Sequence, residues 1–249
     1  MRPIDLHSSA NTISAVQLPA PFAPIGDHIG IALPGGRALF TTRRGGVSTG
    51  PYASLNLGRS TDDEPAAIDE NRRRLAAAID ISLDDLVQVR QVHGVHVERI
   101  EQRPQERIEA DGQATTLRGM ALLAITADCL PIALVGPGAV AILHAGWRGL
   151  ANGVIEEGVK AIGAPFAAAI GPGAGGCCYE VGDEVRAAFG ASGRTVDLKA
   201  IARERLAAAG VAEIHDTGLC TICSHPGLFF SHRRDGGITG RQAGVVWRS

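Results

Sequence analysis

Cys129 and His144 are the two side chains of this sequence best placed to do chemistry together. Each stands at the end of an apolar run and is flanked by polar or turn-forming residues, where a buried strand would continue with apolar ones. A thiolate and an imidazole can share a divalent metal ion, or they can form a nucleophile and its base. Taken singly, each residue type is more often structural, so their joint placement favours a functional role.

The two residues belong to one predicted β-hairpin. Cys129 comes just before the first of two apolar runs, His144 comes just after the second, and a Gly-Pro-Gly sequence joins the runs. With Pro137 as the centre of the turn, Leu130 lies opposite His144 and Cys129 lies opposite Ala145. Opposed and diagonal neighbours across a hairpin are roughly 4.5–8 Å apart, so we expect Cys129 and His144 to reach one ion.

A catalytic zinc ion usually has three protein ligands and an open fourth position. His93, in Gln91-Val92-His93-Gly94, is the leading candidate for the third ligand because it ends a predicted strand. Its rival His96 lies in an alternating segment that is typical of an ordinary strand. We therefore expect a metal site formed by His93, Cys129 and His144.

A competing metal site would join His96 and Glu98 with Cys220 and Cys223, echoing the His-x-Glu and Cys-x-x-Cys elements of zinc nucleobase deaminases. The match is poor, because Leu219 stands where proline is expected and the two halves are far apart in the sequence. On the preferred interpretation, Cys220 and Cys223 line or buttress a pocket.

Arginines beside glycine-rich turns are candidate anion ligands. Arg43, Arg44 and Arg148 could hold phosphate through their forked donors, and the loop at residues 171–176 could add backbone N–H groups. A single arginine next to glycine is more often a solvated charge at a turn. Three such positions in one fold favour an anion pocket.

The elements that must position these residues alternate between strands and helices. Strands are predicted at residues 38–42, 86–92, 121–126, 131–135, 140–143, 166–170, 211–214 and 244–247, and helices at residues 65–79, 150–162, 183–189 and 197–209. We expect Arg72, Arg73 and Arg74 to form a solvated face of the first helix. The pattern predicts an interleaved α/β fold.

Composition limits the class of protein. The chain has 249 residues, 24 Lys and Arg against 26 Asp and Glu, and a formal net charge of −2, which gives no general attraction to nucleic acid or anionic lipid. No apolar run approaches a membrane span and no secretory signal is visible, so we expect a cytoplasmic protein. Residues 1–30 are predicted to be an irregular lead-in and residues 31–249 a single catalytic domain. The oligomeric state is left open.

The sequence resembles the polyphenol oxidase or laccase-domain family, whose members are also described as purine nucleoside phosphorylases with adenosine deaminase activity. The matching segments are specific and follow one another along most of the chain: residues 42–48, 54–58, 91–94, 127–131, 144–149, 170–172, 177–182, 229–235 and 239–242. His232 and Ala174 depart from the residues usual in the family, which bears on substrate preference.

The resemblance implies a layered, mixed-sheet α/β sandwich and zinc at the positions of His93, Cys129 and His144. It also implies phosphorolysis of adenosine, inosine, guanosine and methylthioadenosine, with adenosine deamination as a second activity. Purine nucleosides and phosphate are therefore the expected small-molecule partners. Copper is expected only as a substitute for zinc, because eight histidines without a His-x-His pair fit a multicopper oxidase badly.

For deamination, the hypothesis is that zinc activates a water for attack at purine C6, with Asp111 or Glu180 moving the proton. For phosphorolysis, the candidates that position phosphate under the ribose are Arg43, Asn56 and Arg148.

Three alternatives stay open. The first is a cysteine hydrolase or amidase that acts on cell-wall precursors through a dyad of Cys129 and His144. The second is a copper-dependent phenol oxidase. The third is a metal-binding protein without catalytic activity.

Overall fold

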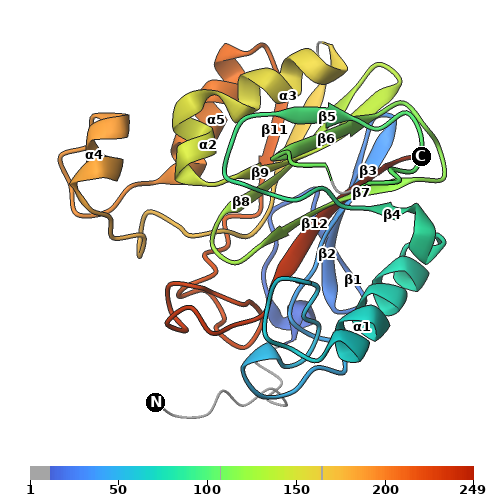
Figure 1. Ribbon diagram of the computed structural model, residues 1–249. Coiled ribbons are helices and arrows are strands. Elements are labelled where there is room, and N and C mark those ends of the chain that lie inside the picture. Colours follow the sequence, from blue (N-terminus) through green and yellow to red (C-terminus); the bar gives the residue numbers. More distant parts are fainter. Residues whose placement is uncertain (1–11, 107, 164) are drawn as a thin grey trace.

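The chain folds into two stacked β-sheets with helices on the outer faces, as the computed structural model shows (Figure 1). The structure describes residues 12–106, 108–163 and 165–249. The predicted fold class, a layered mixed-sheet α/β sandwich, is confirmed.

The first sheet brings together both ends of the described chain. Its strands, in spatial order, are β1 (Ala23–Ile25), β2 (His28–Leu33), β3 (Gly36–Phe40), β12 (Gln242–Arg248), β7 (Ala121–Thr126) and β4 (Leu86–Val87). All neighbours are antiparallel except β4 and β7, which are parallel. The last strand of the chain is therefore enclosed between β3 and β7.

The second sheet carries the hairpin on which the site depends. Its order is β11 (Glu213–Asp216), β10 (Ala167–Ile170), β8 (Leu130–Gly136), β9 (Ala139–Ala145), β6 (Gly112–Thr115) and β5 (Val97–Arg99). β8 and β9 are buried along their whole length. A strand covered on both faces is apolar throughout, which explains the two uninterrupted apolar runs.

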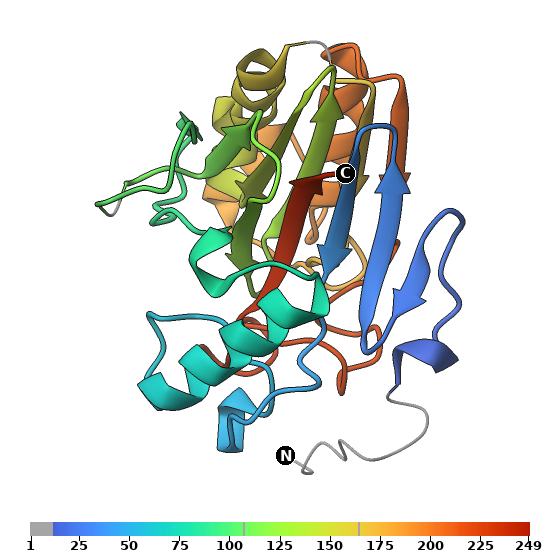
Figure 2. The same cartoon turned by 90° about the vertical axis from the view of Figure 1, so that its right-hand side faces the viewer.

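Helices cover the outer face of each sheet, as the two views show (Figures 1 and 2). The helices are α1 (Pro65–Ala78), α2 (Trp147–Asn152), α3 (Val154–Ile162), α4 (Asp183–Phe189) and α5 (Leu198–Ala208), with short 3-10 turns at Ile13–Ala15, Gly50–Tyr52 and Leu83–Asp85. α1 packs on the first sheet, and α2, α3 and α5 pack on the second. Among the described residues, no helix has the length and apolar character needed to span a bilayer.

A continuous apolar core lies between the two sheets. Phe40 from the first sheet and Ile142 from the second are both fully buried in it, together with Val246 of the last strand. The glycines at 171 and 244 let the layers approach closely, since a Cβ at either would come within 3.4 Å of the Phe40 ring. This core fixes the spacing between the sheets at the end where the site lies.

Several local predictions are wrong in their extent. The helix expected at residues 150–162 is two helices, because Gly153 takes a left-handed conformation (φ 101°) between α2 and α3. The strand expected at residues 86–92 is reduced to β4, since the chain then leaves the sheet and turns at His93. β1 and the start of β2 lie within residues 1–30, for which an irregular lead-in is predicted; β1 has three exposed residues and gives no alternation.

Arg72 also differs from the prediction. Its side chain is buried beneath α1, where Nη1 donates to the carbonyl oxygen of Leu57 at 3.0 Å and to Oε1 of Gln88 at 2.7 Å. Arg73 and Arg74 are solvated and pair with Glu70. A run of three arginines therefore contains one residue that ties α1 to the loops below it.

Candidate metal centre and pocket

Three side chains from separate parts of the chain converge at one end of the second sheet. His93 lies in the turn that follows β4, Cys129 directly precedes β8, and His144 lies near the end of β9. Their donor atoms all lie within 4.8 Å of one another, and Nε2 of His93 is 3.9 Å from Sγ of Cys129. The two imidazole rings meet edge to face, with centroids 4.8 Å apart.

The register of the hairpin brings Cys129 to the side of His144. Pro131 lies opposite His144 and Leu130 opposite Ala145, one residue away from the predicted pairing, because the turn contains the two residues Pro137 and Gly138. Side chains alternate between the two faces of a strand. Cys129, two residues before Pro131, is therefore on the face of His144, whereas the predicted register would put it on the other face.

Asp111 connects the two histidines. Its carboxylate accepts hydrogen bonds from the backbone N–H groups of Val92, His93 and Gly94 at 3.1, 2.9 and 2.6 Å, and it lies 2.8 Å from Nδ1 of His144. The residue is buried. Burial opposes its ionisation, but the hydrogen bonds from His144 and Gly94 outweigh burial and lower the pKa of Asp111. The carboxylate therefore holds the His93 turn, which has a φ of 62°, and leaves Nε2 of His144 for the cluster.

The sulfur and the imidazole of the cluster ionise as a pair. Burial opposes the charge on Cys129, but the neighbouring His144 and His93 outweigh it and lower the pKa of the thiol to about 6. Burial likewise opposes the charge on His144, while the Cys129 thiolate and Asp111 raise its pKa to about 9. The site thus favours a thiolate at neutral pH.

The donor set and its spacing fit a small divalent ion. Zinc–sulfur and zinc–nitrogen bonds of about 2.3 and 2.0–2.1 Å, arranged tetrahedrally, separate sulfur from nitrogen by roughly 3.6 Å, close to the distance from Cys129 to His93. Gly146 leaves room for the cluster, because a Cβ there would lie 3.0 Å from Sγ of Cys129 and 3.1 Å from Cδ2 of His93. Three protein donors leave a fourth position for a reacting group.

A pocket of about 540 Å³ opens over the cluster. Its lining includes the three candidate ligands together with Trp147, Arg148, Tyr179, Arg233 and Arg241. The Arg148 guanidinium lies 4.3 Å from the centre of the Trp147 ring, and the Arg233 guanidinium lies 5.0 Å from that of Tyr179. The volume is in the range of small-molecule sites, and the lining combines aromatic surface with positive charge.

Besides Asp111, which lies behind the cluster, three of the predicted site residues lie outside this lining. Arg43 is buried, stacks 4.4 Å from the centre of the Phe230 ring and donates to the carbonyl oxygen of Ala53 at 2.6 Å. Asn56 is buried. Its side-chain amide forms hydrogen bonds within the loop at residues 56–63, and its Oδ1 also accepts a hydrogen bond from the backbone N–H of Arg241. Glu180 is exposed and pairs with Arg194 at 3.1 Å.

The alternative ligand His96 does not join either metal-competent group among the described residues. Its exposed side chain lies 2.9 Å from Oε2 of Glu98. The pairing of His96 and Glu98 with Cys220 and Cys223 is therefore wrong.

Tyr179, Arg233 and Arg241 also line the pocket, although the predicted site does not include them; they lie in loops after β10 and β11 and in the segment before β12. The signal was present, because each belongs to a segment shared with the laccase-domain family. Nothing local in those segments shows that they face one pocket.

Comparison with known proteins agrees with the fold and with the shared segments. Residues 37–249 match the family described as multi-copper polyphenol oxidoreductase laccase. A purine nucleoside phosphorylase of Pseudomonas aeruginosa is 42% identical over 231 residues, covering 85% of this chain and 93% of that protein. The purine nucleoside phosphorylase YfiH of Escherichia coli is 39% identical over 232 residues, covering 84% and 93%.

Solved structures show the same architecture. YlmD from Geobacillus stearothermophilus superposes with a TM-score of 0.83 at 34% identity, covering 92% of this chain and 99% of that chain. The Neisseria meningitidis protein NMB0706 superposes with a TM-score of 0.81 at 34% identity, covering 88% and 96%. The family description spans most of the sequence and the relatives are matched over nearly their whole length, so the chain belongs to the laccase and polyphenol oxidoreductase family that includes YfiH.

Proposed function

We propose that this protein is a zinc-dependent purine nucleoside phosphorylase with adenosine deaminase activity. The observation that carries the proposal is the cluster of His93, Cys129 and His144 in the wall of a pocket that also presents aromatic rings and arginines. The names of relatives about 40% identical over more than four fifths of the chain support the phosphorylase activity. Zinc is the proposed ion, with copper as a substitute, because two imidazoles and one thiolate suit a borderline-soft cation.

His93, Cys129 and His144 would hold the ion, which when bound supplies a Lewis acid at the pocket wall. Asp111 keeps the Nδ1 side of His144 occupied and fixes the His93 turn. Because the Asp111 carboxylate serves four donors and is buried, we assign it a positioning role instead of proton transfer. Glu180 is exposed and lies outside the pocket lining, so its position does not support a role in moving a proton.

The pocket also suits the two substrates of phosphorolysis. In that reaction a phosphate oxygen bonds to C1′ of the ribose, the bond to the purine nitrogen breaks, and the base leaves with the electron pair and takes up a proton. Arg148 and Arg241 would bind the phosphate, and Trp147 and Tyr179 would pack on the purine. Arg43 and Asn56 would act indirectly, through the loops that they hold.

The test measures nucleoside turnover and zinc content in variants of the cluster, with His96, three residues after His93, as the control position. Purified protein is incubated with adenosine or inosine, with and without phosphate, and adenine, hypoxanthine and inosine are separated. We expect phosphate-dependent release of base, and inosine from adenosine. His93→Ala and Cys129→Ala should lose the zinc ion of this cluster and the product together, while His96→Ala should keep both, because His96 is exposed and outside the cluster. Full turnover by Cys129→Ala would contradict the proposal.

A cysteine hydrolase is the second candidate, since the thiolate and imidazolium of Cys129 and His144 resemble a nucleophile with its base. Metal removal separates the two candidates. Chelation should abolish nucleoside turnover if the ion is required, whereas a hydrolase should stay active without metal and be blocked by a thiol alkylator.

A further inference from the structure

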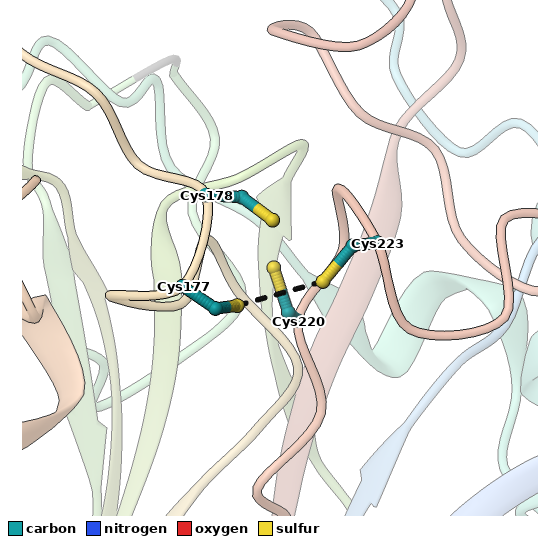
Figure 3. A group of neighbouring side chains, drawn as sticks. All are labelled: Cys177, Cys178, Cys220 and Cys223. Carbon is teal, nitrogen blue, oxygen red and sulfur yellow. Dashed lines mark hydrogen bonds between the residues drawn. The ribbon is translucent and has the colours of Figure 1, made fainter.

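A second group of metal-competent side chains lies in two loops beyond the second sheet. Cys177 and Cys178 follow β10, and Cys220 and Cys223 follow β11. β10 and β11 are parallel neighbours, with Ile170 opposite Asp216, so both loops leave the sheet at the same edge. The loops then stay side by side, because Gly173 and Cys220 form an isolated β-bridge. The four sulfur atoms are turned toward one another (Figure 3).

The spacing of the sulfur atoms suits a single ion. All four Sγ atoms lie within 4.8 Å of one another, and those of Cys177 and Cys223 are 3.5 Å apart. Zinc–sulfur bonds of about 2.3 Å in a tetrahedron place the sulfurs roughly 3.8 Å apart. A disulfide would need about 2.0 Å. An iron–sulfur cubane would need wider separations, because iron and sulfide lie between its cysteines.

The loops are shaped to keep negative charge on the buried sulfur. The N–H of Gly175 donates to Sγ of Cys220 at 3.2 Å. A backbone N–H group directed at a buried sulfur favours its thiolate form. Gly175 is required by the close approach, since a Cβ there would lie 3.2 Å from Sγ of Cys177 and 3.4 Å from Sγ of Cys220.

Packing alone does not account for the group. Buried cysteines often act as small apolar residues, which would explain Cys220. Cys177 and Cys223 are exposed, yet their side chains turn inward toward Cys220 and each other. Four convergent thiols at a surface, one pair in a Cys-x-x-Cys turn, are the donor set of structural zinc sites.

We propose that Cys177, Cys178, Cys220 and Cys223 bind a second zinc ion, separate from the cluster of Cys129. The thiols give up their protons on binding, and the four sulfurs fill the coordination sphere, so the ion is structural. It joins the two loops that form one wall of the pocket. Tyr179 lines the pocket directly, and Oγ1 of Thr221 donates to Oδ1 of Asp128 at 2.7 Å, next to Cys129.

The test counts metal in matched Cys→Ser variants. Full-length reduced protein is purified, and zinc per chain is measured by plasma mass spectrometry. We expect two zinc ions in the wild type, one in Cys129→Ser, one in Cys177→Ser/Cys223→Ser, and none when the three changes are combined. A Cys129→Ser protein without zinc would overturn the proposal, whether or not the protein acts on nucleosides.

Cobalt gives a readout that does not depend on the double variant folding. Cys129→Ser, stripped of zinc under reducing conditions and reconstituted with cobalt(II), should show the strong absorption of cobalt in a tetrahedron of four thiolates. The same absorption should be lost in Cys177→Ser/Cys223→Ser. A spectrum of octahedral, solvated cobalt in Cys129→Ser would overturn the proposal.

Discussion

At the scale of single residues, Asp111 organises the candidate metal centre, because it contacts the parts of the chain that carry both candidate histidine ligands. One buried carboxylate receives three backbone N–H groups from the His93 turn and faces Nδ1 of His144. It orients the side chain of the candidate ligand His144 on β9 and the backbone of the candidate ligand His93 after β4. Carboxylates in this position orient metal-binding histidines and increase their basicity.

Asp111→Asn should weaken zinc binding at the histidine cluster by about 10–100-fold. The amide keeps the shape of the side chain, but it loses the charge that favours the His144 N–H and turns a donor toward one of the N–H groups of the turn. Affinity is measured by competition with a fluorescent chelator. Asp85→Asn, the same change on a carboxylate that pairs with Arg103, should leave affinity unaltered. Equal affinities in both variants would contradict the positioning role.

Thiol reactivity tests the paired ionisation of Cys129. In metal-free protein, alkylation of Cys129 should stay fast at neutral pH and slow only as the pH falls through about 6, because its pKa is lowered and the thiolate persists above that value. Cys223 provides the internal comparison, since its hydrogen bond with Cys178 raises its pKa to about 11. Peptide mapping after brief alkylation across a pH series measures both. Alkylation of Cys129 that begins only near pH 9 would show that the imidazoles do not stabilise the thiolate.

At the scale of elements, the hairpin of β8 and β9 positions two candidate ligands, Cys129 and His144, and the start of α2 closes the site beside them. Gly146 is the N-cap of α2 and takes an extended conformation (φ −74°, ψ 169°), so its backbone does not require glycine. The requirement comes from the cluster, where a Cβ would crowd Cys129 and His93. The connection between the end of β9 and the start of α2 therefore lies so close to the cluster that it leaves no room for a side chain at residue 146.

Gly146→Ala should reduce zinc affinity by about tenfold or more while leaving the fold intact, since it displaces two ligands. Gly182→Ala is the matched control: Gly182 is the N-cap of α4, has φ −78° and ψ 178°, and has nothing within 4 Å of an added Cβ. Zinc content and circular dichroism of both variants are compared with the wild type. If both variants keep full zinc, the ligands move aside more readily than the geometry indicates.

At the scale of the whole molecule, the spacing between the sheets sets where the pocket loops stand. Phe40 is fully buried between the layers, and its ring lies against the glycines at 171 and 244. The segment after β10 that carries Cys177 and Tyr179 starts at this contact. Core packing and site geometry are therefore coupled through one aromatic ring.

Phe40→Ala should lower the free energy of unfolding by about 3–5 kcal/mol, because it leaves a cavity in a core with little freedom to collapse. Phe166→Ala removes the same ring from a position that is 43% exposed, so the loss should stay near 0.5 kcal/mol. Urea unfolding followed by tryptophan fluorescence measures both. Similar losses in the two variants would place the principal core elsewhere.

The sequence by itself determined which residues are candidate ligands and where most of the elements around them lie. Polar and turn-forming residues interrupt apolar runs at Cys129 and His144, and such interruptions are local signals. The same holds for β7 and α4, whose bounds follow from periodicity and flanking turns. Local signals depend on neighbours in the chain, so they can be read without the fold.

Only the tertiary structure decided the register of the hairpin, the part played by Asp111 and the meeting of the four cysteines. β8 and β9 are apolar on both faces, so no alternation distinguishes one register from the next, and a shift of one residue moves Cys129 to the other side of the sheet. Asp111 and the cysteine loops meet their partners through neighbouring strands that are distant in sequence. Which strands become neighbours depends on how the whole core packs, and no segment carries that information alone.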